Sequence, residues 1–314
     1  MNIPEICVMI SRPERLDDIG DVFSVVPGNV FIESVSGLDR EEVVNQLSVG
    51  KLRQILGSDP LGAVRRLYFG QETCERLIPS SEDILKAVRI CAERKWGLSL
   101  VLPYVGSFGV KKIKSLIPVI FEVSETLGQV EFVVQDFAGL MIVSDLKNPN
   151  IIPVLGRLFT KMKRDPRFMM DYAPTRDRSI SLKMKDALRR SGMESAAFVG
   201  LMRSLGVRRF SIEALPQGAD ISRVEELTAD IYWPWIYVTS GRACQMSALS
   251  DPERFRHLME SPCHFECRDA QIIPAEQGAF YSVARGNTIW MEHMNIKSFG
   301  SNISRLVYTP YIPQ

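Results

Sequence analysis

Histidine is scarce in this sequence, with three residues in 314. A Ser-His-Asp triad or a three-histidine zinc centre is therefore poorly supported, and neither G-x-S-x-G nor H-E-x-x-H occurs. No G-x-G-x-x-G follows an early strand, so the dinucleotide-binding fingerprint is missing as well. The sequence therefore lacks the common motifs of serine hydrolases, metalloproteases and dinucleotide-dependent enzymes.

Long apolar runs and an excess of one charge are also missing. No apolar stretch reaches the about 20 residues that span a bilayer, and the first residues lack a basic region followed by a long apolar segment. The formal net charge is +1, so the chain lacks the excess of basic residues that is typical of a nucleic-acid-binding protein. We therefore expect a cytoplasmic protein, in which the six cysteines are metal ligands, catalytic groups or core residues rather than disulfides.

Apolar, β-rich runs alternate with amphipathic segments along most of the chain. The candidate strands are residues 6–10, 66–69, 98–102, 131–135, 151–155, 208–212 and 235–239. The clearest helix begins at Ser80, which can form a capping box with Asp83, and Gly97 can end it. This alternation predicts an α/β fold with a largely parallel sheet.

The number of strand–helix units is sufficient for a (β/α) barrel-like, TIM-barrel-type domain over residues 1–278. An open, doubly wound sheet is the alternative. From residue 279 onward the strands are short and separated by polar residues, so residues 279–314 are expected to form a C-terminal β-strand extension packed on the barrel.

Two of the six cysteines look structural. Cys7 lies in an unbroken apolar strand and Cys91 lies on the apolar face of the helix that Ser80 begins, so both are expected to be small buried hydrophobic residues. The other four follow strands or lie in loops, at Cys74, Cys244, Cys263 and Cys267.

The four remaining cysteines have the spacing C-x169-C-x18-C-x3-C. Loops that follow different barrel strands converge on one face, so a long separation in sequence does not prevent a shared site. Four thiolates can hold zinc or an iron–sulfur cluster. Arg242 could stabilise the thiolate charge, and His264 could donate to a sulfur atom, although an exposed loop histidine is the simpler interpretation.

Two stretches of sequence resemble the peptidase U32 family. The segment "RLYFGQETCER", in which Cys74 follows a strand that ends in Tyr-x-Gly, is similar to the start of that fold. The segment "VTSGRACQMSALSDPERFRHLMESPCHFECRDA" is similar to the family's cysteine cluster. The order of the cysteines matches the iron–sulfur branch that acts in oxygen-independent hydroxylation during ubiquinone biosynthesis.

The resemblance implies a [4Fe-4S] cluster with Cys74, Cys244, Cys263 and Cys267 as ligands. It also implies a protein partner of the same family, with a homo-oligomer as the alternative. The substrate would be a ubiquinone-like aromatic ring or a nucleobase, with prephenate as the oxygen donor. The older family name implies a peptidase, and a binding protein with a structural four-cysteine zinc site is a further alternative.

A basic segment departs from the family pattern. Arg157, Lys161 and Arg164 would share one face of a helix, which could be a solvated surface or an anion site for a dicarboxylate such as prephenate. Asp136 follows the strand at 131–135 and could act as an acid or base, although a turn residue is the more ordinary role. The aromatic run 232–235 could pack in the core or hold a flat quinone ring.

Overall fold

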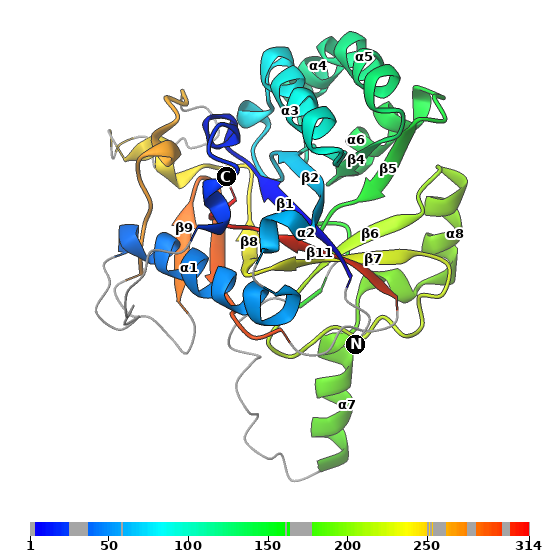
Figure 1. The fold of residues 1–314 in the computed structure, drawn as a ribbon. Coiled ribbons are helices and arrows are strands. Elements are labelled where there is room, and N and C mark those ends of the chain that lie inside the picture. Colours follow the sequence, from blue (N-terminus) through cyan, green and yellow to red (C-terminus); the bar gives the residue numbers. More distant parts are fainter. Residues whose placement is uncertain are drawn as a thin grey trace.

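A closed barrel of parallel strands forms the body of the protein (Figure 1). The computed structural model describes residues 4–24, 37–57, 59–160, 162–163, 178–249, 251, 253, 262–274, 281–296 and 302–313. Around the barrel the strands are β1 (Glu5–Ile10), β2 (Val64–Gly70), β3 (Gly97–Val101), β4 (Val130–Val134), β5 (Ile151–Leu155), β6 (Arg209–Glu213), β7 (Thr228–Trp233) and β11 (Ile303–Tyr308). The predicted (β/α) barrel-like fold is confirmed.

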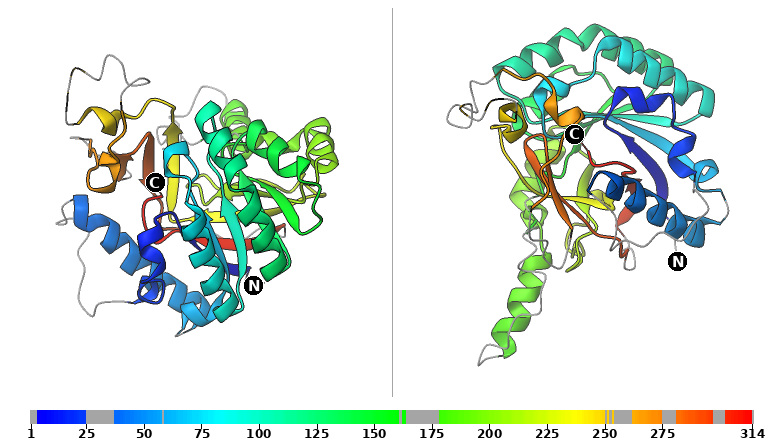
Figure 2. Two further views of the ribbon diagram at one scale, coloured as in Figure 1. Left: turned by 90° about the horizontal axis from the view of Figure 1, so that it is seen from above. Right: turned by 90° about the vertical axis from the view of Figure 1, so that its left-hand side faces the viewer.

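Helices α3 to α6 cover one side of the barrel (Figure 2), whereas α7 projects away from it (Figure 1). The helices are α1 (Gly37–Leu56), α2 (Pro60–Ala63), α3 (Ser81–Arg94), α4 (Ser107–Ser115), α5 (Ile117–Leu127), α6 (Phe137–Asp145), α7 (Arg178–Arg189) and α8 (Ala196–Ser204). Within the described part of the chain, no helix combines the length and the apolar character needed to cross a membrane.

Helix α3 forms for the local reasons that its sequence indicates. The Ser80 hydroxyl accepts a hydrogen bond from the Asp83 N–H, and the Asp83 carboxylate accepts one from the Ser80 N–H. Ile84, Val88 and Cys91 are buried on its inner face. The predicted end at Gly97 is wrong, because Lys95 adopts a left-handed conformation with φ 56° and ends the helix two residues earlier.

The barrel interior is filled in layers by alternate side chains of the strands. The middle layer is mainly apolar and includes Cys7, so its predicted burial is confirmed. Towards the amino-terminal ends of the strands, Asp230 accepts hydrogen bonds from Tyr68 and Arg209, and Arg305 donates to Glu131 at 2.6 Å. A satisfied polar network therefore closes this end of the barrel.

A separate three-stranded antiparallel sheet, in the order β8-β10-β9, lies in the segment between β7 and β11. Its strands are β8 (Trp235–Ser240), β9 (Ser282–Arg285) and β10 (Thr288–Glu292). The predicted division at residue 279 is therefore wrong, since β11 is a barrel strand that pairs with both β1 and β7.

The error has a physical origin in the aromatic run around Pro234. The predicted strand at residues 235–239 is β8, which lies in the small sheet, and the barrel strand just before Pro234, β7, is not among the predicted strands. Tyr232, Trp233 and Trp235 are all completely buried, so the packing interpretation of these aromatics is confirmed. They offer no surface on which a quinone could lie.

Candidate metal centre

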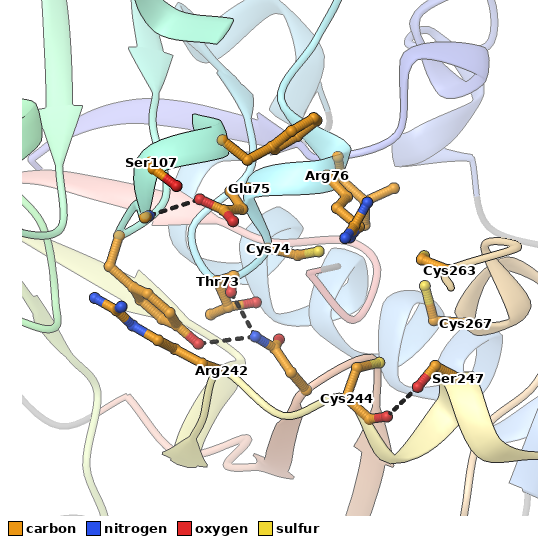
Figure 3. Close-up of a pocket in the computed structure, with 15 residues that line it drawn as sticks. Thr73, Cys74, Glu75, Arg76, Ser107, Arg242, Cys244, Ser247, Cys263 and Cys267 are labelled. Atoms are coloured by element: carbon orange, nitrogen blue, oxygen red, sulfur yellow. Dashed lines mark hydrogen bonds between the residues drawn. The ribbon is translucent and has the colours of Figure 1, made fainter. Parts of the chain in front are cut away.

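The four candidate cysteines line one cavity of about 300 Å³ outside the carboxyl end of β2. They come from three segments that are far apart in sequence: Cys74 follows β2, Cys244 follows β8, and Cys263 and Cys267 lie between β8 and β9. Figure 3 shows Cys74 on one side of the cavity, with Cys263 and Cys267 across from it. The fold therefore brings together the residues that the sequence selected.

The position of Cys74 depends on a sharp change of direction at the end of β2. Gly70 has φ 129°, and a Cβ atom there would lie 2.3 Å from the carbonyl oxygen of Val101, so only glycine fits. The side-chain oxygen of Gln71 then accepts hydrogen bonds from the N–H groups of Glu72 and Thr73, at 2.8 and 3.1 Å. This small loop fixes the backbone that leads to Cys74.

Short 3-10 helices position two of the other cysteines. Cys244 precedes the 3-10 helix Gln245–Ala248, and its carbonyl oxygen accepts a 2.7 Å hydrogen bond from the Ser247 hydroxyl. Cys267 lies inside the 3-10 helix Glu266–Arg268, which follows Phe265 in a left-handed conformation with φ 62°. Cys263 lies in the irregular segment just before this second helix.

The β9–β10 hairpin joins these segments to one another. Arg285 donates to the carbonyl oxygen of Cys267 at 3.1 Å. The Asn287 amide donates to the carbonyl oxygens of Thr73 and Gly241, each at 2.6 Å. Thr73 is the residue before Cys74, and Gly241 lies three residues before Cys244. One hairpin thus contacts all three cysteine-bearing segments.

Burial controls the ionisation of these thiols. It raises the pKa of Cys74 to about 11 and that of Cys267 to about 12, and it also raises the pKa of Cys244. The neighbouring cysteines raise these pKa values further, because a second thiolate in the same cavity would be repelled. Raised pKa values are the opposite of what a nucleophilic cysteine needs, whereas a bound metal stabilises thiolates directly.

Zinc and an iron–sulfur cluster place different demands on four cysteines. Zinc requires four sulfur atoms at about 2.3 Å from a single point. A [4Fe-4S] cluster binds each thiolate through a different iron atom, so its ligands stand farther apart around a larger space. Among the described residues, no group of three or more His, Cys, Asp or Glu side chains forms a ready site for a metal ion. The four thiols line one cavity, which is the arrangement that a cluster would need.

The remaining predicted site residues have different positions. Arg242 lines the cavity, whereas His264 is exposed and does not. Asp136 caps α6, and its two carboxylate oxygens accept hydrogen bonds from the N–H groups of Gly139 and Val105, at 2.8 and 2.7 Å. Asp136 therefore has the role of a turn residue and does not reach the cysteines.

The predicted basic face does not form at Arg157. Residues 157–159 form a turn, and the Arg157 side chain is completely buried, where it pairs with Glu72 and Glu213. Its guanidinium is already engaged by two carboxylates, so Arg157 is removed from the proposed anion site. Lys161 and Arg164 lie outside the described residues.

Sequence analysis missed several residues of the cavity wall. Tyr104 lines the cavity and donates to the carbonyl oxygen of Gly241 at 2.6 Å. Glu75 accepts hydrogen bonds from the N–H groups of Gly106 and Gly109, at the start of α4. The sequence indicates Asn287 only as part of a Gly-Asn pair between two short strands, which is typical of a turn. None of these residues has a motif of its own, because their roles depend on distant segments.

Comparison with known proteins gives no match to a family model, a curated protein or a solved structure.

Proposed function

We propose that Cys74, Cys244, Cys263 and Cys267 hold a [4Fe-4S] cluster and that the protein acts in oxygen-independent hydroxylation. The observation that carries the proposal is the convergence of these four cysteines on one cavity. No other cysteine lies there: Cys7 is inside the barrel and Cys91 is buried on α3. When bound, such a cluster would supply one-electron chemistry at the mouth of the barrel.

The rest of the cavity wall supports a role in binding a substrate. The cysteines occupy part of the lining, and Arg76, Tyr104, Phe108 and Arg242 occupy another part. Phe108 is 46% exposed and offers a face for a flat ring, while the two arginines could bind carboxylates. A purely structural metal site would be enclosed by protein, whereas this cavity leaves space beside the thiols.

The finer parts of the proposal rest on the resemblance of the two cysteine segments to the U32 branch. They comprise a ubiquinone-like or nucleobase substrate, prephenate as oxygen donor, and a partner of the same family. The arginines at the cavity are compatible with a dicarboxylate donor. The peptidase alternative is not favoured by the cavity, since its thiols have raised pKa values and His264 lies outside it.

Anaerobic purification followed by metal analysis tests the cluster. We expect brown protein with broad absorbance near ~400 nm and about four irons and four sulfides per chain. Single Cys→Ala changes at the four positions should each lower the iron content, whereas Cys91→Ala should leave it unchanged. Stoichiometric zinc without iron would reject the cluster in favour of a structural site.

Hydroxylation requires its own measurement. The cluster-loaded protein, with its co-purifying partner, should hydroxylate a ubiquinone precursor without dioxygen when prephenate is supplied. Full cluster content together with cleavage of peptide substrates and no hydroxylated product would instead support the peptidase alternative.

A further inference from the structure

A second pocket lies directly beside the cysteine cavity. Its volume is about 190 Å³, and Arg76 and Leu77 line both spaces. The second pocket contains none of the four cysteines. Its walls come from the segment after β1, the start of α3, helix α4 and the 3-10 helix Glu266–Arg268. Four elements therefore converge on a space that the proposed cluster does not use.

Basic side chains dominate this pocket. Arg76, Lys112 and Arg268 come from three different elements, and none of them forms an ion pair with a carboxylate in the described part of the chain. Arg76 and Arg268 instead lie over the rings of Phe108 and Phe265, 5.3 and 4.8 Å from their centroids. These aromatic contacts hold the guanidinium groups in place while their N–H donors remain available.

Two carboxylates also line the pocket. Asp83 accepts hydrogen bonds from the backbone and hydroxyl of Ser80, as part of the cap of α3, and its charge also acts on Lys112. Glu14 is exposed and lies near Arg12, which itself pairs with Glu41 at 3.1 Å. With Arg12 paired, three cations face two carboxylates, so the lining has an excess of positive charge.

The position of Lys112 further favours an anion in this pocket. Lys112 is half-buried, and burial lowers the pKa of its ammonium group, while the Asp83 carboxylate opposes that shift. A bound anion would offset the cost of this burial. The amino-terminal end of α3 adds little attraction, because the Asp83 carboxylate already caps it.

We propose that this pocket binds the phosphate group of a small molecule. Two guanidinium forks and one ammonium group, arriving from separate directions, suit a tetrahedral dianion with several oxygen atoms. A planar carboxylate would be satisfied by a single fork. Because Arg76 and Leu77 are common to both spaces, the remainder of a phosphate ester could extend towards the cysteine cavity. The site does not depend on whether the cysteines hold iron.

Calorimetric titration of the full-length protein tests this site, with inorganic phosphate as the probe and chloride holding the ionic strength constant. The wild type should bind phosphate saturably, and Lys112→Gln and Arg268→Gln should each weaken binding by about tenfold. Lys111→Gln is the matched control, since Lys111 is the neighbouring exposed lysine outside the pocket, and it should leave the Kd within about twofold. Phenyl phosphate in a parallel titration distinguishes an ester ligand, which would bind more tightly, from free phosphate.

Two results would overturn the proposal: no saturable binding by the wild type, or equal loss of affinity in Lys112→Gln and Lys111→Gln. Thermal unfolding of each variant shows that it is folded. Iron is measured on the same samples, so a protein that lacks iron but binds phosphate would reject the cluster and retain this site.

Discussion

At the scale of single residues, the candidate site depends on side chains that donate hydrogen bonds to the backbone of the cysteine-bearing segments. Asn287 is the clearest case, because its amide lies within hydrogen-bonding distance of the Thr73 carbonyl, the Gly241 carbonyl and the Tyr104 hydroxyl. These contacts connect the segment of Cys74 to the segment of Cys244. A backbone carbonyl left without its donor costs about 1 kcal/mol or more where it is shielded from water.

Asn287→Ala should therefore loosen the cysteine site without unfolding the barrel. We expect the cluster to lose iron to a chelator roughly tenfold faster, since 1.4 kcal/mol corresponds to tenfold. In metal-free protein the same change should speed the reaction of Cys74 with a thiol reagent. Asn148→Ala is the control, since its amide contacts Ser124 away from the site. Equal rates in the two variants would contradict a positioning role.

Sequence alone predicted that the four cysteines lie together, because each follows a strand or lies in a loop near one, and the structure has all four lining one cavity. The sequence could not identify Asn287, Arg285 or Tyr104. Their partners at the site include backbone carbonyls at least 17 residues away, and the sequence does not indicate which carbonyl a side chain will reach. It also misjudged Arg157, whose burial depends on one carboxylate from the loop after β2 and one from β6.

At the scale of elements, the end of β2 decides where the first cysteine lies. Gly70 is held against the carbonyl oxygen of Val101 on β3, with a backbone conformation that other residues rarely adopt. The loop 71–74 starts from this point. The alternation of strands and helices predicted the barrel, but it could not reveal which strands close the barrel, since β7 and β8 are continuous in composition.

Gly70→Ala should destabilise the protein by about 2 kcal/mol or more, because the new methyl group would collide with the Val101 carbonyl. Gly50→Ala offers a matched comparison, since Gly50 lies within α1 and a Cβ atom there meets nothing within 4 Å. That change should be neutral or stabilising by about 0.5–1 kcal/mol. Urea unfolding of both variants measures the difference, and a similar effect at the two positions would refute this account of Gly70.

At the scale of the whole molecule, a buried ion-pair cluster closes the carboxyl-terminal end of the barrel. Arg157 donates to Glu72 at 3.0 Å, to Glu213 at 3.3 Å and to the carbonyl oxygen of Trp235 at 3.0 Å. These partners come from the loop after β2, from β6 and from β8, so one side chain joins the barrel to the small sheet. At this end the barrel axis is therefore filled by buried side chains.

Arg157→Ala would leave two buried carboxylates without their cation, which is costly because a charge out of water needs compensation. We expect the free energy of unfolding to fall by about 3–5 kcal/mol. Arg89→Ala, at an exposed position on α3, should change it by less than about 0.5 kcal/mol. Chemical denaturation compares the two, and an Arg157→Ala protein as stable as the wild type would show that the cluster contributes little.

The closure of the barrel by β11 has a consequence for the order of events during synthesis. All four cysteines precede Ile303 in the sequence, so they leave the ribosome before the strand that completes the barrel. At that stage no strand yet pairs with both β1 and β7. The β9–β10 hairpin, which contacts the three cysteine-bearing segments, has just been synthesised. Insertion of the proposed cluster is therefore expected as a late step, after β11 has paired with β1 and β7.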